Sequence, residues 1–267
     1  MRFTKMHGAG NDFIIIDNTK ENIPEEKLSA LAARLCSRRL SIGADGLMAV
    51  CPAKNGGDYA MLFYNSDGSL GEMCGNGARC ICRFAHDLGI AGETMTVETD
   101  AGLVPGWRLD ENTYRVRLNN PGVLDLHRKG DIAYAELGSP GVPHAVAEYE
   151  GDLWADADSL RERMRALRFD PAFPKGANVN FYQWMGPGEV RMLTFERGVE
   201  DYTLACGTGC GSTAAVLSLL GKLPGGTLTA HNRGGTLKVT VSREGDAVRE
   251  ILLEGPTQVV RKYDLPL

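Results

Sequence analysis

One cysteine pattern occurs twice in this 267-residue chain, at positions 132 residues apart. The segments "EMCGNGARCICRFAHDLG" (72–89) and "LACGTGCGSTAAVLSLLG" (204–221) each place a cysteine before Gly-x-Gly and a helix-like stretch. Aligning Cys74 with Cys206 also matches Phe63 with Phe195, Gly75 with Gly207, Gly77 with Gly209, and Gly89 with Gly221. An internal repeat of this length predicts two similar halves, and this constrains the fold more than any other feature.

Further matches in the same order extend the repeat on both sides of the cysteines. Residues 41–47 match 174–180, and residues 94–102 match 227–235, both at an offset of 133. We therefore predict a first domain of residues 1–118 plus 256–267, carrying Cys74, and a second domain of residues 119–255, carrying Cys206. The linker is expected near residues 119–130.

The pattern of each half predicts its architecture: a strand, a helix, strands, the cysteine helix and further strands. The early helices are expected at 24–39, with Pro24 at its start, and at 156–168. The second cysteine helix is apolar on nearly all sides, which predicts an enclosed helix, whereas the first carries Arg79 and Arg83 off its apolar face. The fold class is α/β of the α+β type: two pseudo-symmetric domains, each with strands wrapped around a central helix.

Composition excludes several classes of protein. The chain is 43% hydrophobic with a net charge of −5, and its Lys and Arg residues are dispersed among acidic ones, so no nucleic-acid partner is expected. The apolar run at the N-terminus, Phe13 to Ile16, is too short to cross or enter a membrane. Seven cysteines in a chain of this size indicate reduced thiols. We predict a cytoplasmic protein with no membrane partner.

A thiol at a helix N-terminus has a chemistry of its own. The helix dipole favours the thiolate, and the unbonded N–H groups of the first turn bind a carboxylate or phosphate. If a twofold axis brought the two cysteines to opposite sides of one carbon atom, one would remove a proton while the other donated one to the opposite face. This is stereoinversion, and it needs no cofactor; no lysine stands out as an anchor for pyridoxal phosphate.

Five segments make the chain resemble the diaminopimelate epimerase family over nearly its whole length. They are "MHGAGNDFIIID", "GADGL", "YNSDGSLGEMCGNGARC", "GANVNF" and "FERGVEDYTLACGTG". The resemblance implies cofactor-independent inversion of LL-2,6-diaminopimelate to the meso form, in lysine and peptidoglycan precursor synthesis. It also implies a homodimer, and a C-terminal strand in "GPTQVVRKYDLPL" that returns to the first domain.

The resemblance implies a role for individual residues. Cys74 and Cys206 are the expected acid/base pair, and His144 is expected to assist proton movement. Glu196 is expected both to take part in catalysis and to bind the substrate. The residues expected to bind the amino and carboxylate groups of this small amino acid substrate are Asn11, Asn65, Gly75, Asn76, Asn178, Glu196, Arg197, Gly207 and Thr208.

Two departures from the family pattern bear on the substrate. Val142 stands in "GVPH" where the family usually has Asn, and Gly46 stands where some members have Gln. A site that lacks a hydrogen bond to its substrate loses selectivity. A two-thiol racemase of another amino acid, resembling proline or histidine, is therefore an alternative.

Other interpretations of the cysteines are weaker. Cys74, Cys80 and Cys82 lack the spacing of a zinc site, so no metal is expected. "CGTGCGS" resembles a dinucleotide-binding turn, but Ser212 occupies the third glycine position. A thiol redox protein is the non-catalytic alternative, although no Cys-x-x-Cys motif is present.

Overall fold

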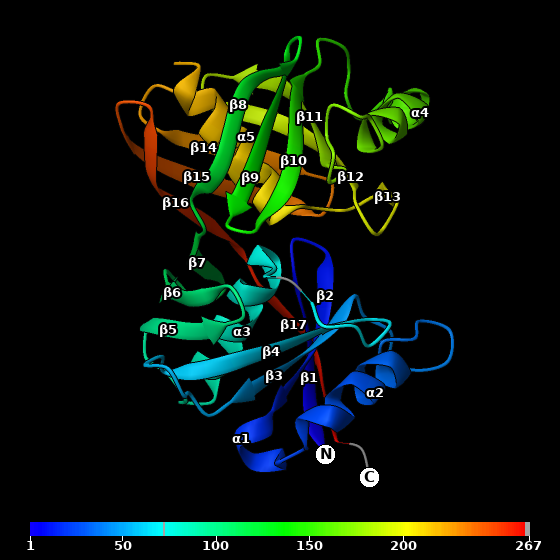
Figure 1. The fold of residues 1–267 in the computed structure, drawn as a ribbon. Helices are drawn as coiled ribbons and strands as arrows, with labels where there is room; N and C mark the ends of the chain where they lie inside the picture. Colours follow the sequence, from blue (N-terminus) through cyan, green and yellow to red (C-terminus); the bar gives the residue numbers. More distant parts are fainter. Residues whose placement is uncertain (72, 265–267) are drawn as a thin grey trace. The chain divides into compact units, whose positions relative to one another are not determined.

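The computed structural model describes residues 1–71 and 73–264, and the chain divides into two compact units. The first unit is Met1–Val116 with Gly255–Leu267, and the second is Arg117–Glu254. The predicted α/β fold class is confirmed: in each unit strands surround one helix (Figure 1). Of the segment 256–267 that was predicted to return to the first domain, residues 265–267 lie outside the described residues.

The first unit is a sheet in which the C-terminal strand joins the N-terminal one. Its strands are hydrogen-bonded in the order β17–β1–β2–β3–β4–β5–β6–β7, with β2–β3 and β4–β5 parallel and the other pairs antiparallel. The strands are β1 (Arg2–Gly8), β2 (Asn11–Asp17), β3 (Gly46–Cys51), β4 (Tyr59–Asn65), β5 (Thr94–Thr99), β6 (Gly102–Arg108), β7 (Thr113–Leu118) and β17 (Gln258–Asp264). The helices are α1 (Asn18–Glu21), α2 (Glu25–Leu35) and α3 (Gly75–Asp87).

The second unit repeats this order of pairing. Its strands follow β8–β9–β10–β11–β12–β14–β15–β16, with β10–β11 and β12–β14 parallel, and the short β13 pairs with β12. The strands are β8 (Pro121–Lys129), β9 (Ile132–Gly138), β10 (Gly141–Glu148), β11 (Asn178–Gly186), β12 (Glu189–Glu196), β13 (Asp201–Tyr202), β14 (Thr227–Asn232), β15 (Gly235–Glu244) and β16 (Ala247–Pro256). The helices are α4 (Ala157–Arg168) and α5 (Gly207–Leu219).

The positions of the helices complete the equivalence of the two units. In each unit the connection of the first parallel pair contains an outer helix, α2 or α4, and in the first unit the short α1 precedes it. The second parallel pair is connected through the cysteine helix, α3 or α5. The expectation of a linker at 119–130 was wrong, because residues Pro121–Lys129 form β8. The backbone of this segment pairs with β9 even though its polar composition resembles that of a linker.

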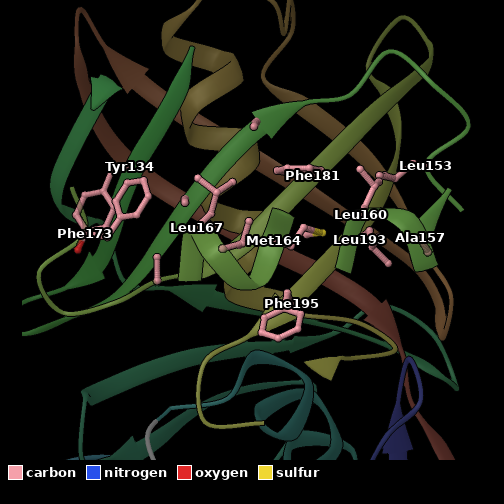
Figure 2. Packing of buried hydrophobic residues seen from close by; sticks show 14 residues of the cluster. Tyr134, Leu153, Ala157, Leu160, Met164, Leu167, Phe173, Phe181, Leu193 and Phe195 are labelled. Atoms are coloured by element: carbon pink, nitrogen blue, oxygen red, sulfur yellow. The ribbon is translucent and has the colours of Figure 1, made fainter. Parts of the chain in front are cut away.

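The two outer helices each pack an apolar face on the strands of their unit. In the second unit α4 contributes Leu160, Met164 and Leu167 to a core that includes Phe181 and Phe195 (Figure 2). In the first unit Leu28, Leu31, Ala32 and Leu35 of α2 pack in the same way against β2 and β3. Each buried Leu or Phe side chain stabilises the fold by about 2 kcal/mol.

Helix α2 ends earlier than the sequence suggested, at Leu35 instead of Arg39. The carbonyl groups of Leu35 and Cys36 accept hydrogen bonds from the N–H groups of Gly43 (3.0 Å) and Ala44 (3.1 Å). The chain between them therefore forms a closed loop, residues 36–45, which lies next to the N-terminus of β2 through Asp12 and Asp45.

The two cysteine helices end as predicted. Gly89 and Gly221 follow the C-termini of α3 and α5 with φ angles of +68° and +70°, the left-handed conformation in which glycine is favoured. The predicted enclosure of α5 is confirmed, since Gly209–Ser218 are all buried. For α3 the expectation was wrong at one position: Arg79 is 0% exposed. In the described part of the chain no helix is long and apolar enough to span a membrane.

Candidate active site

Both cysteines of the repeat lie at the N-caps of their helices, as predicted. Cys74 precedes α3 with φ −115° and ψ 115°, and Cys206 precedes α5 with φ −115° and ψ 108°. The two backbones are therefore nearly identical at these residues. Each thiol lies at the positive end of a helix, where N–H groups without helical partners favour an anion.

The hydrogen bonds of the two sulfur atoms differ. Cys206 Sγ accepts from the N–H of Gly209 at 3.3 Å and lies 3.5 Å from Thr208 Oγ1. Cys74 Sγ donates to Asn11 Oδ1 at 3.3 Å, and this bond requires the thiol form because a carbonyl oxygen only accepts. The repeat thus presents one sulfur to a donor and the other to an acceptor.

The surroundings of Cys74 contain two of the predicted substrate-binding residues. Asn11 begins β2, and its Nδ2 donates to Asp45 Oδ2 at 2.6 Å. Asn76 lies in the first turn of α3 and is only 1% exposed; its Nδ2 lies 3.5 Å from Asn11 Oδ1. Asn11, Asn76 and Cys74 therefore form one hydrogen-bonded group.

Asn65 closes a turn in the segment that leads from β4 toward α3. Its Nδ2 donates to Ser69 Oγ at 3.0 Å, its backbone N–H donates to the Ser69 carbonyl at 2.9 Å, and its carbonyl accepts from Gly68. These bonds give Asn65 a local role in shaping the turn, in addition to the substrate contact that the sequence suggested.

In the second unit one of the predicted charged residues, Glu196, acts on Cys206, and the other, Arg197, follows it in the chain. Burial raises the pKa of Cys206 well above that of an ordinary thiol, and the negative charge of Glu196, the last residue of β12, raises it further. The N–H of the neighbouring Arg197 donates to Asn178 Oδ1 at 2.7 Å. Asn178 itself is the first residue of β11.

His144 is fully buried in β10, directly beside Asn178 in the parallel register of β10 and β11. Burial, with a smaller contribution from the charge of Arg197, lowers the pKa of His144 to about 3, so its imidazole is neutral at pH 7. Its Nδ1 lies 3.1 Å from Nδ2 of Asn180. Asn180 was not predicted from the sequence.

The hydrogen bonds of Asn180 determine the tautomer of His144. Asn180 Nδ2 also donates to the carbonyl groups of Ala145 and Asn178 at 3.1 Å, and Oδ1 accepts from Thr194 Oγ1 at 3.0 Å. The amide nitrogen therefore faces His144, Nδ1 accepts, and the imidazole proton is on Nε2. Among the described residues Nε2 has no hydrogen-bond partner although it is buried. His144 therefore offers one N–H donor.

The first turns of α3 and α5 supply the remaining predicted residues: Gly75 and Asn76, and Gly207 and Thr208. A Cβ atom at Gly77 would overlap the terminal methyl group of Met48, and one at Gly209 would overlap the amide oxygen of Asn180. Glycine at these positions allows other side chains to approach the helix closely.

Three residues in contact with this site were missed by the sequence analysis: Asp45, Arg79 and Asn180. Asp45 and Arg79 lie within the quoted motifs "GADGL" and "CGNGARC", and Asn180 within "GANVNF". Membership of those motifs was the available signal. In the segments 1–71 and 73–264, no cluster of three or more His, Cys, Asp or Glu residues is arranged to hold a metal ion.

Comparison with known proteins identifies the family. A family model described as diaminopimelate epimerase matches residues 3–122 and 137–260. A diaminopimelate epimerase from Methanothrix thermoacetophila is 37% identical over 275 residues, which cover 97% of this chain and 94% of that protein. One from Aquifex aeolicus is 35% identical over 268 residues, with coverages of 96% and 94%.

Solved structures with low sequence identity share the fold. A phenazine biosynthesis protein of the PhzF family from Bacillus anthracis has a TM-score of 0.74 at 15% identity, with 100% of this chain and 99% of that one covered. A probable proline racemase from Agrobacterium radiobacter K84 has a TM-score of 0.71 at 18% identity, with coverages of 100% and 93%. The family model and the two sequence relatives each match most of the chain, and the chain belongs to the diaminopimelate epimerase family.

Proposed function

We propose that this enzyme inverts one Cα of LL-2,6-diaminopimelate to give the meso form, in the biosynthesis of lysine and peptidoglycan precursors. The observation that carries the proposal is the pair of cysteines with matching backbone geometry at the N-caps of α3 and α5, in a chain that belongs to this family. We further propose that the two compact units are the two epimerase halves, each supplying one thiol.

The reaction moves two protons. A thiolate takes the Cα proton and becomes a thiol, leaving a carbanion, and the second thiol then donates its proton to the opposite face and becomes a thiolate. Cys74 and Cys206 are the proposed pair, and they exchange roles when the reaction runs in reverse. The free enzyme regains its starting protonation state by exchange with solvent.

Glu196 connects substrate binding to the generation of the base. Its charge contributes to the raised pKa of Cys206, so that Cys206 is a thiol in the absence of substrate. An ammonium group of the substrate bound at Glu196 would offset this charge and favour the thiolate. Substrate binding thereby prepares the base by releasing the Cys206 thiol proton to solvent, and the unbound enzyme keeps a less reactive thiol.

The carbanion is stabilised by groups that carry no net charge. The N–H groups at Gly75, Asn76, Gly207 and Thr208 would bind the reacting carboxylate at the two positive helix ends, and donors of this kind contribute about 3 kcal/mol each. His144, held neutral with its proton on Nε2, is proposed to act as an N–H donor. Asn11, Asn65, Asn178 and Arg197 are proposed to hold the other polar groups of the substrate.

Proton exchange at Cα tests the reaction. In deuterated water the enzyme should convert the LL isomer to meso product that carries deuterium at the inverted Cα, detected by chiral chromatography and mass spectrometry. Unlabelled meso product would rule out the two-base route. A panel of other L-amino acids tests the racemase alternative, for which the support is weaker: the likeness to a probable proline racemase is one of fold at 18% identity.

The assembly and location of the enzyme are also proposals. We propose a cytoplasmic homodimer, on the basis of family resemblance and of reduced thiols. Light scattering coupled to size-exclusion chromatography should give twice the chain mass of 28.9 kDa. A mass of one chain at micromolar concentration would contradict the dimer.

A further inference from the structure

A chain of four polar side chains crosses the Cys74 site of the first unit. Arg79 Nη2 donates to Asn76 Oδ1 at 2.8 Å, Asn76 Nδ2 donates to Asn11 Oδ1 at 3.5 Å, and Asn11 Nδ2 donates to Asp45 Oδ2 at 2.6 Å. Every bond in this chain points the same way, from the guanidinium group toward the carboxylate.

The two ends leave each amide only one orientation. A guanidinium group has donors alone, so Asn76 must turn its oxygen toward Arg79, and an ionised carboxylate only accepts, so Asn11 must turn its nitrogen toward Asp45. The oxygen of Asn11 consequently faces Cys74 Sγ, at 3.3 Å. Without Asp45, only the long 3.5 Å bond from Asn76 Nδ2 would keep the Asn11 amide in this orientation.

We propose that Asp45 and Arg79 are positioning residues for the reaction: they orient the amides of Asn11 and Asn76 and, through Asn11, hold Cys74 in its thiol form. The inference rests on the proposed function, which assigns Cys74 to proton transfer and the two asparagines to the substrate. Asp45 and Arg79 act only through these residues.

The surrounding protein holds both ends of the chain in place. Arg79 is fully buried and also donates to the Gly75 carbonyl at 3.1 Å. Asp45 accepts from Arg38 Nη2 at 2.6 Å and from the N–H of Asp12 at 3.1 Å. Among the described residues, the charged groups around the site include Arg79 from α3, Asp45 and Arg38 from the loop 36–45, and Asp12 and Lys5 from the β1–β2 hairpin. Lys5 Nζ lies 3.0 Å from Asp12 Oδ2. The neighbouring Cys80 thiol of α3 is kept neutral by burial, which raises its pKa to about 12.

The second unit has no counterpart of this chain at the aligned positions. Asn178 is aligned with Asp45 at the offset of 133, and Gly211 is aligned with Arg79 at the offset of 132. The donor that faces Cys206 is a backbone N–H of its own helix. The two thiols therefore start from different hydrogen-bonded states, with Cys74 arranged as the proton donor.

Site-resolved alkylation tests the proposal. Wild type and Asp45→Asn are treated with iodoacetamide across a pH series, and modification of Cys74 and Cys206 is measured by peptide mass spectrometry. Asp45→Asn removes a negative charge and lets the Asn11 nitrogen face the sulfur, and both changes favour the thiolate. The pH midpoint for Cys74 should fall by about one unit, which corresponds to about tenfold faster modification below the midpoint.

Three comparisons make the result specific. The pH midpoint for Cys206 should stay unchanged in Asp45→Asn. In Asp45→Glu, which keeps the carboxylate, the Cys74 midpoint should fall by no more than half as much as in Asp45→Asn. Asp58→Asn should leave the Cys74 midpoint unchanged. Asp58 is a matched control, since it is also a carboxylate of the first unit that accepts a backbone N–H, from Thr96. An unchanged or raised Cys74 midpoint in Asp45→Asn overturns the proposal.

A double-mutant cycle separates amide orientation from charge alone. In an Asn11→Ala background the Asp45→Asn shift should be less than half as large, because no amide remains to turn; an equal shift in both backgrounds overturns the role of Asn11.

If Asp45→Asn does not fold, the infrared S–H band of wild-type Cys74, identified by its loss in Cys74→Ala, decides the question. Its presence with a hydrogen-bonded frequency at pH 7 supports the proposal, and its absence refutes it. None of these measurements depends on epimerase activity, so the proposed function and this inference can fail separately.

Discussion

The two units have the same order of strands and helices, yet their cysteine helices are built differently. Helix α3 carries the buried charged side chain of Arg79 and the buried thiols of Cys80 and Cys82. At the aligned positions α5 carries Gly211, Ser212 and Ala214. The sulfur at the start of α3 faces an amide oxygen from β2, and the sulfur at the start of α5 faces an N–H of its own helix. The shared backbone places two thiols alike, and the side chains around them make the thiols unequal.

The largest effect should come from removing either thiol. Cys74→Ser and Cys206→Ser should each lower the epimerisation rate by about 10³-fold, because a hydroxyl group is a far weaker acid than a thiol and general acid–base catalysis contributes 10² to 10⁴. Rates are measured by chiral chromatography. Cys51→Ser, at a half-buried thiol of β3 that is not at a helix N-cap, serves as the control and should keep wild-type activity. A variant at either position that retains a tenth of wild-type activity would contradict the two-base assignment.

The second-largest loss of activity should come from removing the Asn180 side chain, which contacts His144 in the second unit. Asn180→Ala leaves Nδ1 of His144 and the hydroxyl group of Thr194 without their partner, and we expect a 10- to 100-fold loss of activity, equivalent to about 1–3 kcal/mol. Asn232→Ala is a matched control, since Asn232 is a buried amide that donates to the Ala230 carbonyl. Equal losses of activity in Asn180→Ala and Asn232→Ala would show that Asn180 contributes to the stability of the fold and not to catalysis.

The two units should lose stability over different ranges of acidic pH. In the second unit the pKa of His144 lies near 3 in the folded state and near 6.5 in the unfolded state, so the unfolded chain takes up a proton first. The free energy of unfolding should fall as the pH drops below 6.5, by about 2 kcal/mol at pH 5. His144→Gln should reduce this pH dependence when the free energy of unfolding is measured by urea denaturation. Nitrogen-15 spectra should show a neutral imidazole with its proton on Nε2 down to pH 4. A protonated imidazole at pH 6 would contradict the assignment.

The acid response of the first unit depends on Asp12. Burial alone would raise the pKa of Asp12, but its hydrogen bonds and ion pairs with Arg38 and Lys5 outweigh burial and lower it. This contribution to stability is present above the pKa of the unfolded chain and is lost as the pH falls below about 4. Asp12→Asn should flatten the curve only in that range. A change confined to pH 5–6.5 would contradict the assignment.

The smallest expected difference concerns two aligned glycines. Alanine at Gly77 meets the flexible end of Met48. Alanine at Gly209 meets Asn180, whose amide lies within hydrogen-bond distance of His144, Ala145, Asn178 and Thr194. Gly209→Ala should therefore be less stable than Gly77→Ala by about 1–2 kcal/mol in urea denaturation. The opposite order would indicate that Met48 is the less adaptable neighbour.

Much of the architecture could be predicted because it depends on local signals. Glycines at 89 and 221 ended the two helices as expected, and both cysteines are N-caps. The exceptions depend on backbone pairing with a neighbouring segment of the chain, which composition does not reveal. Residues 121–129 resemble a linker in composition but pair with β9, and α2 ends at Leu35 because residues 43 and 44 fold back onto its last carbonyl groups.

The sequence by itself determined the duplication, the two thiols at helix N-termini and the family. Periodicity, capping residues and motif order are local properties, and they can be read along the chain. Only the tertiary structure decided that Arg79 is buried, that Asp45 orients Asn11 from 34 residues away, and that Asn180 sets the tautomer of His144 from 36 residues away. The reason is physical: the direction of a hydrogen bond depends on which groups meet in space, and in these cases the groups come from different strands and loops.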